Sequence, residues 1–115
     1  MLTQKDKVFC ACMALISIAA LYFTWSNNIA FFQQADNGGI MGFIRDANAN
    51  PAAASLSWDL LFLTLAACTL MVQEARRWGV RLVWLYIFFA MTIAISVVFP
   101  LFLIARQIGI AKARK

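Results

Sequence analysis

Histidine is absent from this chain of 115 residues. The absence excludes haem or chlorophyll bound through histidine, most zinc and non-haem iron sites, and Ser-His or Cys-His catalysis. A cofactor held by this chain would need carboxylate, amide, backbone or water ligands. From the sequence we predict no cofactor and no metal site, and contact with lipid or pigment stays open.

Charged residues are scarce too, at 13% of the chain, whereas a soluble domain usually carries about 25%. Hydrophobic residues make up 63% of the chain, and the mean hydropathy is +0.78. A soluble protein this small cannot bury so much apolar surface. The composition therefore predicts an integral membrane protein in contact with the lipid bilayer.

Cysteine is limited to Cys10, Cys12 and Cys68, all inside apolar runs. A redox or metal role would need a CxxC spacing or other ligands nearby, and the sequence has neither. We expect these side chains to act as small apolar packing residues.

What the chain does contain is three long apolar runs, Val8–Trp25, Leu56–Val72 and Leu82–Ile104. Each is about as long as the roughly 20 residues that a helix needs to cross the hydrocarbon core. They predict an all-α fold in a single membrane domain. The expected segments are transmembrane helices at about 5–25, 51–78 and 82–106, a loop at 26–50, and a basic tail at 107–115.

The second helix has clear start and stop signals. Asn50 is a good N-cap, Pro51 suits the first helical position, and Gly79 suits the C-terminal stop. The link to the third helix, about Gly79–Arg81, is very short, and short links make neighbouring helices antiparallel. We therefore expect the second and third helices to form a tight antiparallel hairpin, with the first helix attached more loosely.

Two further features concern helix packing. Small residues recur on the first helix with a spacing of three, which leaves a strip where another helix can come close; they are Ala11, Ala14, Ser17 and Ala20. Pro100 frees the carbonyl of Ser96 and predicts a kink there in the third helix.

The loop between the first two helices contains the apolar clusters Phe31-Phe32 and Ile40–Ile44, so we expect it to pack on the membrane surface with a short interfacial helix.

The net charge of +5 does not indicate nucleic-acid binding, because the basic residues lie at segment ends rather than on one face. Three continuous spans would place the two termini on opposite sides of the membrane. The Lys and Arg residues would then divide five and five, and the positive-inside rule would not decide the orientation. The first helix often dominates, which weakly favours a cytoplasmic N-terminus.

Asp59 is the most informative charge, because it falls inside an apolar run. A carboxylate at midspan costs on the order of 2.5–3.5 kcal/mol, and less near the interface. We expect it to have a partner, either Arg106 reaching back along the third helix or Arg45 of the loop. A structural ion pair or helix-start anchor is favoured over a proton relay or substrate site.

Glu74 lies three residues before Arg77 on the same helix face, and Arg81 can reach it across the turn. An interfacial salt bridge that fixes the hairpin is the favoured interpretation. Asp59 and Glu74 are about 22 Å apart along a helix, so they cannot act as a paired acid and base. We assign no catalytic residue.

Several polar residues recur in apolar surroundings with a distinctive spacing: Asn50-Pro51, Asp59-Leu60, Glu74, Arg76-Arg77, Trp84-x-Tyr86 and Pro100-Leu101-Phe102-Leu103-x-x-Arg106. This pattern resembles the Domain-of-Unknown-Function-2834 family of small bacterial and cyanobacterial membrane proteins, over about Phe43 to Gln107. The resemblance implies three membrane helices and no established activity. Gln107 departs from it, since a Glu is expected after the Arg, and the tail 111–115 looks like an extension.

For function, the sequence favours a non-catalytic accessory or structural subunit of a larger membrane complex, respiratory or photosynthetic in type. The expected partners are lipid and other integral membrane subunits, in a bacterial inner or thylakoid-type membrane, with no nucleic acid. The alternatives are a small transporter or channel-like oligomer using Asp59, and a small membrane enzyme acting on lipid or isoprenoid substrates.

Overall fold

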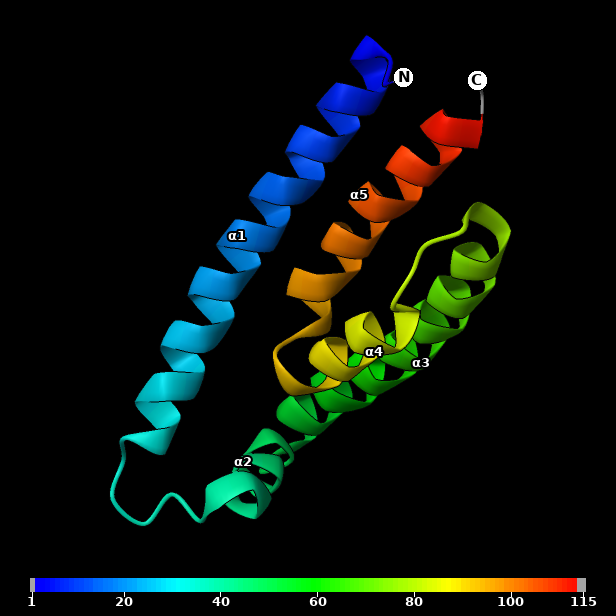
Figure 1. Cartoon of the computed structure of the whole chain (residues 1–115). Helices are drawn as coiled ribbons and strands as arrows, with labels where there is room; N and C mark the ends of the chain where they lie inside the picture. Colours follow the sequence, from blue (N-terminus) through cyan, green and yellow to red (C-terminus); the bar gives the residue numbers. More distant parts are fainter. Residues whose placement is uncertain (1, 114–115) are drawn as a thin grey trace.

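The computed structural model describes residues 2–113, which are entirely helical apart from short connections (Figure 1). The five helices are α1 (Gln4–Phe32), α2 (Gly39–Ala47), α3 (Pro51–Trp78), α4 (Val83–Thr92) and α5 (Ile95–Ala113). Three of them, α1, α3 and α5, are long and apolar enough to cross a membrane. The expected all-α fold with three apolar helices long enough to span is confirmed.

Local capping accounts for where the first helix starts. The Thr3 hydroxyl accepts a hydrogen bond from the Asp6 backbone N–H at 3.1 Å, and the Asp6 carboxylate accepts one from the Thr3 N–H at 2.9 Å. This reciprocal capping box satisfies two donors that would otherwise be unpaired. The helix continues beyond its apolar run to Phe32.

The second long helix, α3, begins and ends where the sequence predicts. The Asn50 side chain accepts a hydrogen bond from the Ala53 N–H at 2.8 Å, and Pro51 occupies the first turn. Gly79 ends the helix in the left-handed conformation with φ of 71°, which glycine adopts without the strain a side chain brings.

The third apolar run is not one helix, so the prediction of a continuous helix over 82–106 is wrong. The run is divided at Ile93 and Ala94 into α4 and α5. Figure 1 shows α4 running back along α3 and α5 then reversing to run alongside α1. The two ends of the chain therefore lie at the same end of the molecule rather than at opposite ends.

Contacts from α1 hold this break in place. The Trp25 indole N–H donates to the Ile93 carbonyl at 3.0 Å, and the Ser17 hydroxyl donates to the Val97 carbonyl at 2.6 Å. Non-helical backbone at membrane depth is tolerated where protein covers it and its polar groups are satisfied. Pro100 lies buried inside α5 rather than at the break. The interruption falls just before the Ser96 site where a kink was expected.

The core lies where α3, α4 and α5 meet. Met71 and Phe102 are fully buried there, and the Tyr86 ring meets the Phe102 ring edge-on at 5.6 Å between centroids. On α5, a Cβ at Gly109 would lie 2.7 Å from the backbone oxygen of Trp78, so α5 approaches the end of α3 closely. The small side chain of Ala75 is buried in the same region.

The first helix is not loosely attached, contrary to expectation. It packs along most of α5: Asp6 and Ser17 bond to α5, and Trp25 bonds to Ile93 within the break. Ser17 is 3% exposed, and Ala14 and Ala20 on the same strip are half-buried. The predicted small-residue strip thus meets a helix, although Ala11 remains exposed.

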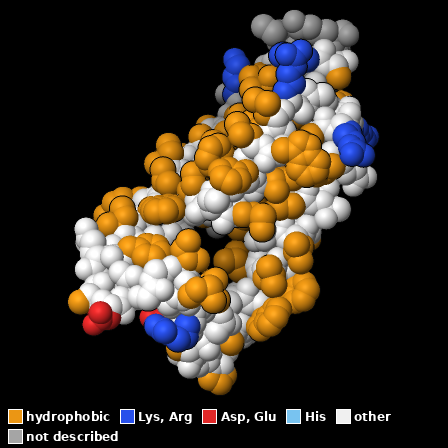
Figure 2. Space-filling view, turned by 60° about the horizontal axis from the view of Figure 1, so that its bottom comes forward, with side chains coloured by type: hydrophobic (Ala, Val, Ile, Leu, Met, Phe, Trp, Pro, Cys, Tyr) orange, Lys and Arg blue, Asp and Glu red, His pale blue; other side chains and the backbone are white. Residues whose placement is uncertain are grey.

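The fold also changes the distribution of charge. Arg45 lies at the α2 end of the molecule, beside Asp46, and the basic residues gather at the opposite end (Figure 2). Within residues 2–113, that basic end contains Lys5, Lys7, Arg76, Arg77, Arg81, Arg106 and Lys112. The five-to-five division expected for three continuous spans does not hold.

Candidate functional site

Glu74 is the centre of the most developed polar cluster. Its carboxylate accepts a hydrogen bond from Arg106 Nε at 2.6 Å and another from the Trp78 indole N–H at 3.0 Å, both at Oε2. The Glu74 side chain is 10% exposed and the Arg106 side chain 29%. Because the guanidinium and the carboxylate are both ionised, this short bond between α3 and α5 is charge-assisted.

The predicted ion pairs of Glu74 with Arg77 or Arg81 are therefore replaced by a pair with Arg106. Arg77 instead lies over the Trp78 ring, with its guanidinium carbon 5.1 Å from the ring centroid. Arg81 occupies the short connection before α4 and is exposed. The cluster joins the end of α3 to α5 rather than closing the turn after α3.

A second polar contact at the same end was missed from the sequence. The Gln107 side-chain amide donates to Asp6 Oδ1 at 2.6 Å, and Asp6 is only 5% exposed. The pattern of Thr3 followed by Asp6 is a signal that could have placed this carboxylate in a helix cap. The contact also gives Gln107 a role, because an ionised glutamate at this position could not donate to Asp6.

Asp59 does not find either of its expected partners. Arg106 is bonded to Glu74. Arg45 Nε lies 3.6 Å from Asp46 Oδ1, and both of these side chains are exposed at the end of α2. Asp59 itself is exposed on the outer face of α3. Among residues 2–113 it makes no ion pair and no hydrogen bond through its side chain.

The chemistry available to these groups is limited. Asp59 and Glu74 stand 15 positions apart on one continuous helix, which separates them by about 22 Å. Within the described residues, no group of three or more cysteine and acidic side chains gathers in a way that could hold a metal ion. What the polar groups do here is join helices: Glu74 joins α3 to α5, and Asp6 joins α1 to α5.

Comparison with known families gives a match over most of the chain. A family model described as protein of unknown function DUF2834 matches residues 13–108, which is most of the chain. The chain belongs to this family. The match begins in α1, so it extends further toward the N-terminus than the resemblance seen from Phe43 onward. No curated protein and no solved structure matches the chain.

Proposed function

We propose that this chain is a non-catalytic accessory or structural subunit of a larger complex in a bacterial inner or thylakoid-type membrane. A respiratory or photosynthetic complex is the type that we favour. The observation that carries the proposal is Asp59, an exposed carboxylate inside an apolar run with no partner among residues 2–113.

The surroundings of Asp59 form a continuous outer face of α3. Residues spaced by three or four along a helix share a face, and those around Asp59 are exposed: Ala52, Ser55, Leu56, Phe62, Leu63 and Ala66. Small residues at both ends of this face let another helix approach closely. A cation on that helix would offset the cost of holding the carboxylate in an apolar setting.

The α2 helix adds a second exposed surface, near the start of α3. It leaves Ile40 and Met41 about three-quarters exposed, at 73% and 74%, and its end is tied to α3 by a 2.8 Å bond from the Ser57 hydroxyl to the Ala47 carbonyl. Exposed apolar side chains on a short amphipathic helix suit the membrane interface or a neighbouring subunit. The start of α3 and the α2 helix thus offer two exposed apolar surfaces at this end of the molecule.

The transporter and enzyme alternatives receive less support from the position of Asp59. A transport path or substrate site inside one chain needs its carboxylate to line a cavity, and Asp59 points to neither of the two apolar pockets beside α2 and α4. Its exposure instead suits contact with another chain.

The test is purification of the tagged chain in mild detergent, with Asp59→Asn as the variant and Asp46→Asn as the control. The wild type and the control should bring down a partner in stoichiometric amount. Asp59→Asn keeps the size of the side chain and removes its charge, so it should lose that partner while still inserting. Recovery of the wild type as a lone monomer or homo-oligomer would contradict the proposal.

A further inference from the structure

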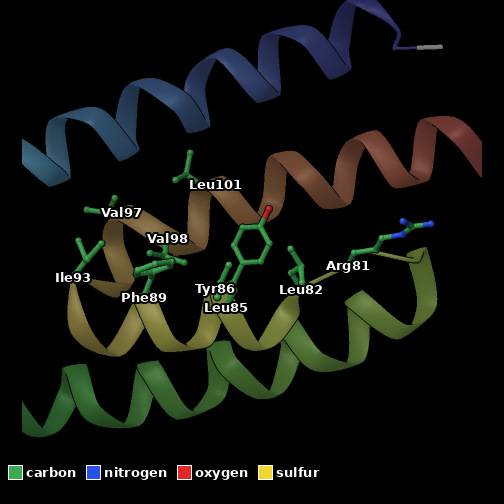
Figure 3. Close-up of a pocket in the computed structure, with 9 residues that line it drawn as sticks. All are labelled: Arg81, Leu82, Leu85, Tyr86, Phe89, Ile93, Val97, Val98 and Leu101. Carbon is green, nitrogen blue, oxygen red and sulfur yellow. The ribbon is translucent and has the colours of Figure 1, made fainter.

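A groove runs between α4 and α5 on the outside of the molecule (Figure 3). Its volume is about 270 Å³, and its lining is apolar except for Arg81 and Tyr86. Leu85 and Phe89 contribute from α4, and Val98 and Leu101 from α5. The groove exists because the third apolar run folds back on itself instead of continuing as one helix.

The residues on the floor of the groove are buried, and those on its wall are exposed. Val97 and Val98 on the floor are 6% and 4% exposed, whereas Leu82 and Leu85 on the wall are 70% and 50% exposed. A groove of this shape can bind a narrow apolar chain that enters from the side. In a membrane, the acyl chains of the surrounding lipids have that shape and chemistry.

The length of the groove matches one lipid leaflet. Its α4 side extends from Leu82 to Ile93, which corresponds to about 16 Å of helix. This is close to half of the roughly 30 Å hydrocarbon core of a bilayer. The break at Ile93 lies at the other end of the groove, so an acyl chain that enters from the basic end would reach the break near the bilayer centre.

Arg81 supplies a charge at the open end. Figure 3 shows its side chain at the end of the groove, directed away from the apolar lining. Glu74, the acidic residue expected to hold it, is bonded to Arg106, and Arg81 makes no ion pair among residues 2–113. A guanidinium has a rigid fork of donors that fits a phosphate, and it carries its charge at every physiological pH.

We propose that this groove binds one anionic phospholipid, with its phosphate on Arg81 and one acyl chain along α4 and α5. Basic pockets between membrane helices on the side of an anionic leaflet are suited to such head groups. The other basic residues at this end of the molecule raise the local concentration of anionic lipid, and Arg81 is the one placed at the groove. This site is separate from the Asp59 face and does not depend on the proposed subunit role.

The test is native mass spectrometry of the purified full chain titrated with dioleoyl phosphatidylglycerol, and with dioleoyl phosphatidylcholine for comparison. The wild type should bind one phosphatidylglycerol more tightly than phosphatidylcholine. Arg81→Gln should weaken phosphatidylglycerol binding about fivefold, the effect of one cation near an anionic head group. Arg81→Lys should keep most of the preference. Glycerol 3-phosphate should fail to compete, because the acyl chain supplies part of the affinity.

Matched variants separate the groove from general charge and from misfolding. Arg76→Gln removes a cation from the same end but not from the groove, and it should leave the preference intact. Leu101→Trp fills the groove and should weaken both lipids, whereas Ile108→Trp on the same helix should not. Equal losses from Arg81→Gln and Arg76→Gln, or unchanged binding in Leu101→Trp, would overturn the proposal. So would a wild type without preference for phosphatidylglycerol.

Discussion

The pair between Glu74 and Arg106 shows how one residue contact defines the position of a helix. Its 2.6 Å distance fixes the depth of α5 against the end of α3. Two charges in a largely apolar setting gain attraction but lose hydration, so the net contribution of such a pair to stability is small. The value of the pair lies in specifying which turn of α5 meets which turn of α3.

Removing one partner of this pair should therefore cost more than removing both. Glu74→Gln or Arg106→Gln leaves a charge without its partner, and each should lower the free energy of unfolding more than the loss of both charges does. The double variant Glu74→Leu with Arg106→Leu should recover much of that loss. Thermal unfolding in detergent, followed by circular dichroism, measures these differences. A double variant as unstable as the sum of the single variants would show that the charges act independently.

The wrong partner predicted for Glu74 has a physical origin. In a continuous third helix, Arg106 would lie near the start of the second helix, close to Asp59. The break at Ile93 reverses the chain and brings Arg106 back to the end of α3 instead. From the sequence, Glu74 is expected to pair with Arg77 or Arg81, and Arg106 with Asp59, because the observed pairing depends on a turn that no local signal marks. Neither glycine nor proline occurs at positions 92–95.

At the level of helices, the break between α4 and α5 depends on α1. Helix starts and ends such as Asn50-Pro51 and Gly79 follow from short-range bonding, so they could be predicted from neighbouring residues. The break could not, because the groups that donate hydrogen bonds to its backbone carbonyls are Ser17 and Trp25, about 70 to 80 positions earlier. Contacts at such a separation have no signature in local composition.

Loss of the Ser17 hydroxyl should weaken the docking of α1 against α5. Ser17→Ala leaves the Val97 carbonyl without its side-chain donor, and we expect a loss of about 0.6–1.7 kcal/mol in the free energy of unfolding. Ser26→Ala is the matched control, because the Ser26 hydroxyl bonds the Tyr22 carbonyl of its own helix and is exposed. Denaturant titration in detergent should detect the first loss and little change in the control. Equal losses in Ser17→Ala and Ser26→Ala would show that the Ser17 hydrogen bond does not stabilise the break.

Over the whole molecule, the two ends of the described chain lie at the same end, so the positive-inside rule can now predict an orientation. Seven Lys and Arg residues of the described chain lie at the end shared by the termini, and Arg45 lies at the other. The positive-inside rule places the richer end in the cytoplasm. The α2 helix and the connection before it then face the opposite side.

This orientation predicts the behaviour of reporter fusions at the two termini. Green fluorescent protein fused to either end should fluoresce, since this orientation puts both ends in the cytoplasm. Alkaline phosphatase fused to either end should be inactive, and the same enzyme inserted at Gly38 should be active. Opposite results at the two termini would mean that the third apolar run crosses as one helix in the cell.

The dependence of the break on α1 also sets an order for synthesis. Ser17 and Trp25 leave the ribosome long before Ile93 and Val97 are made, so their donors are already available when the last apolar run arrives. That run then packs against a helix whose donors satisfy the backbone carbonyls at the break. In lipid alone these carbonyls would be satisfied only by a continuous helix. We therefore expect the N-terminal helix to act as the template against which the end of the chain reverses.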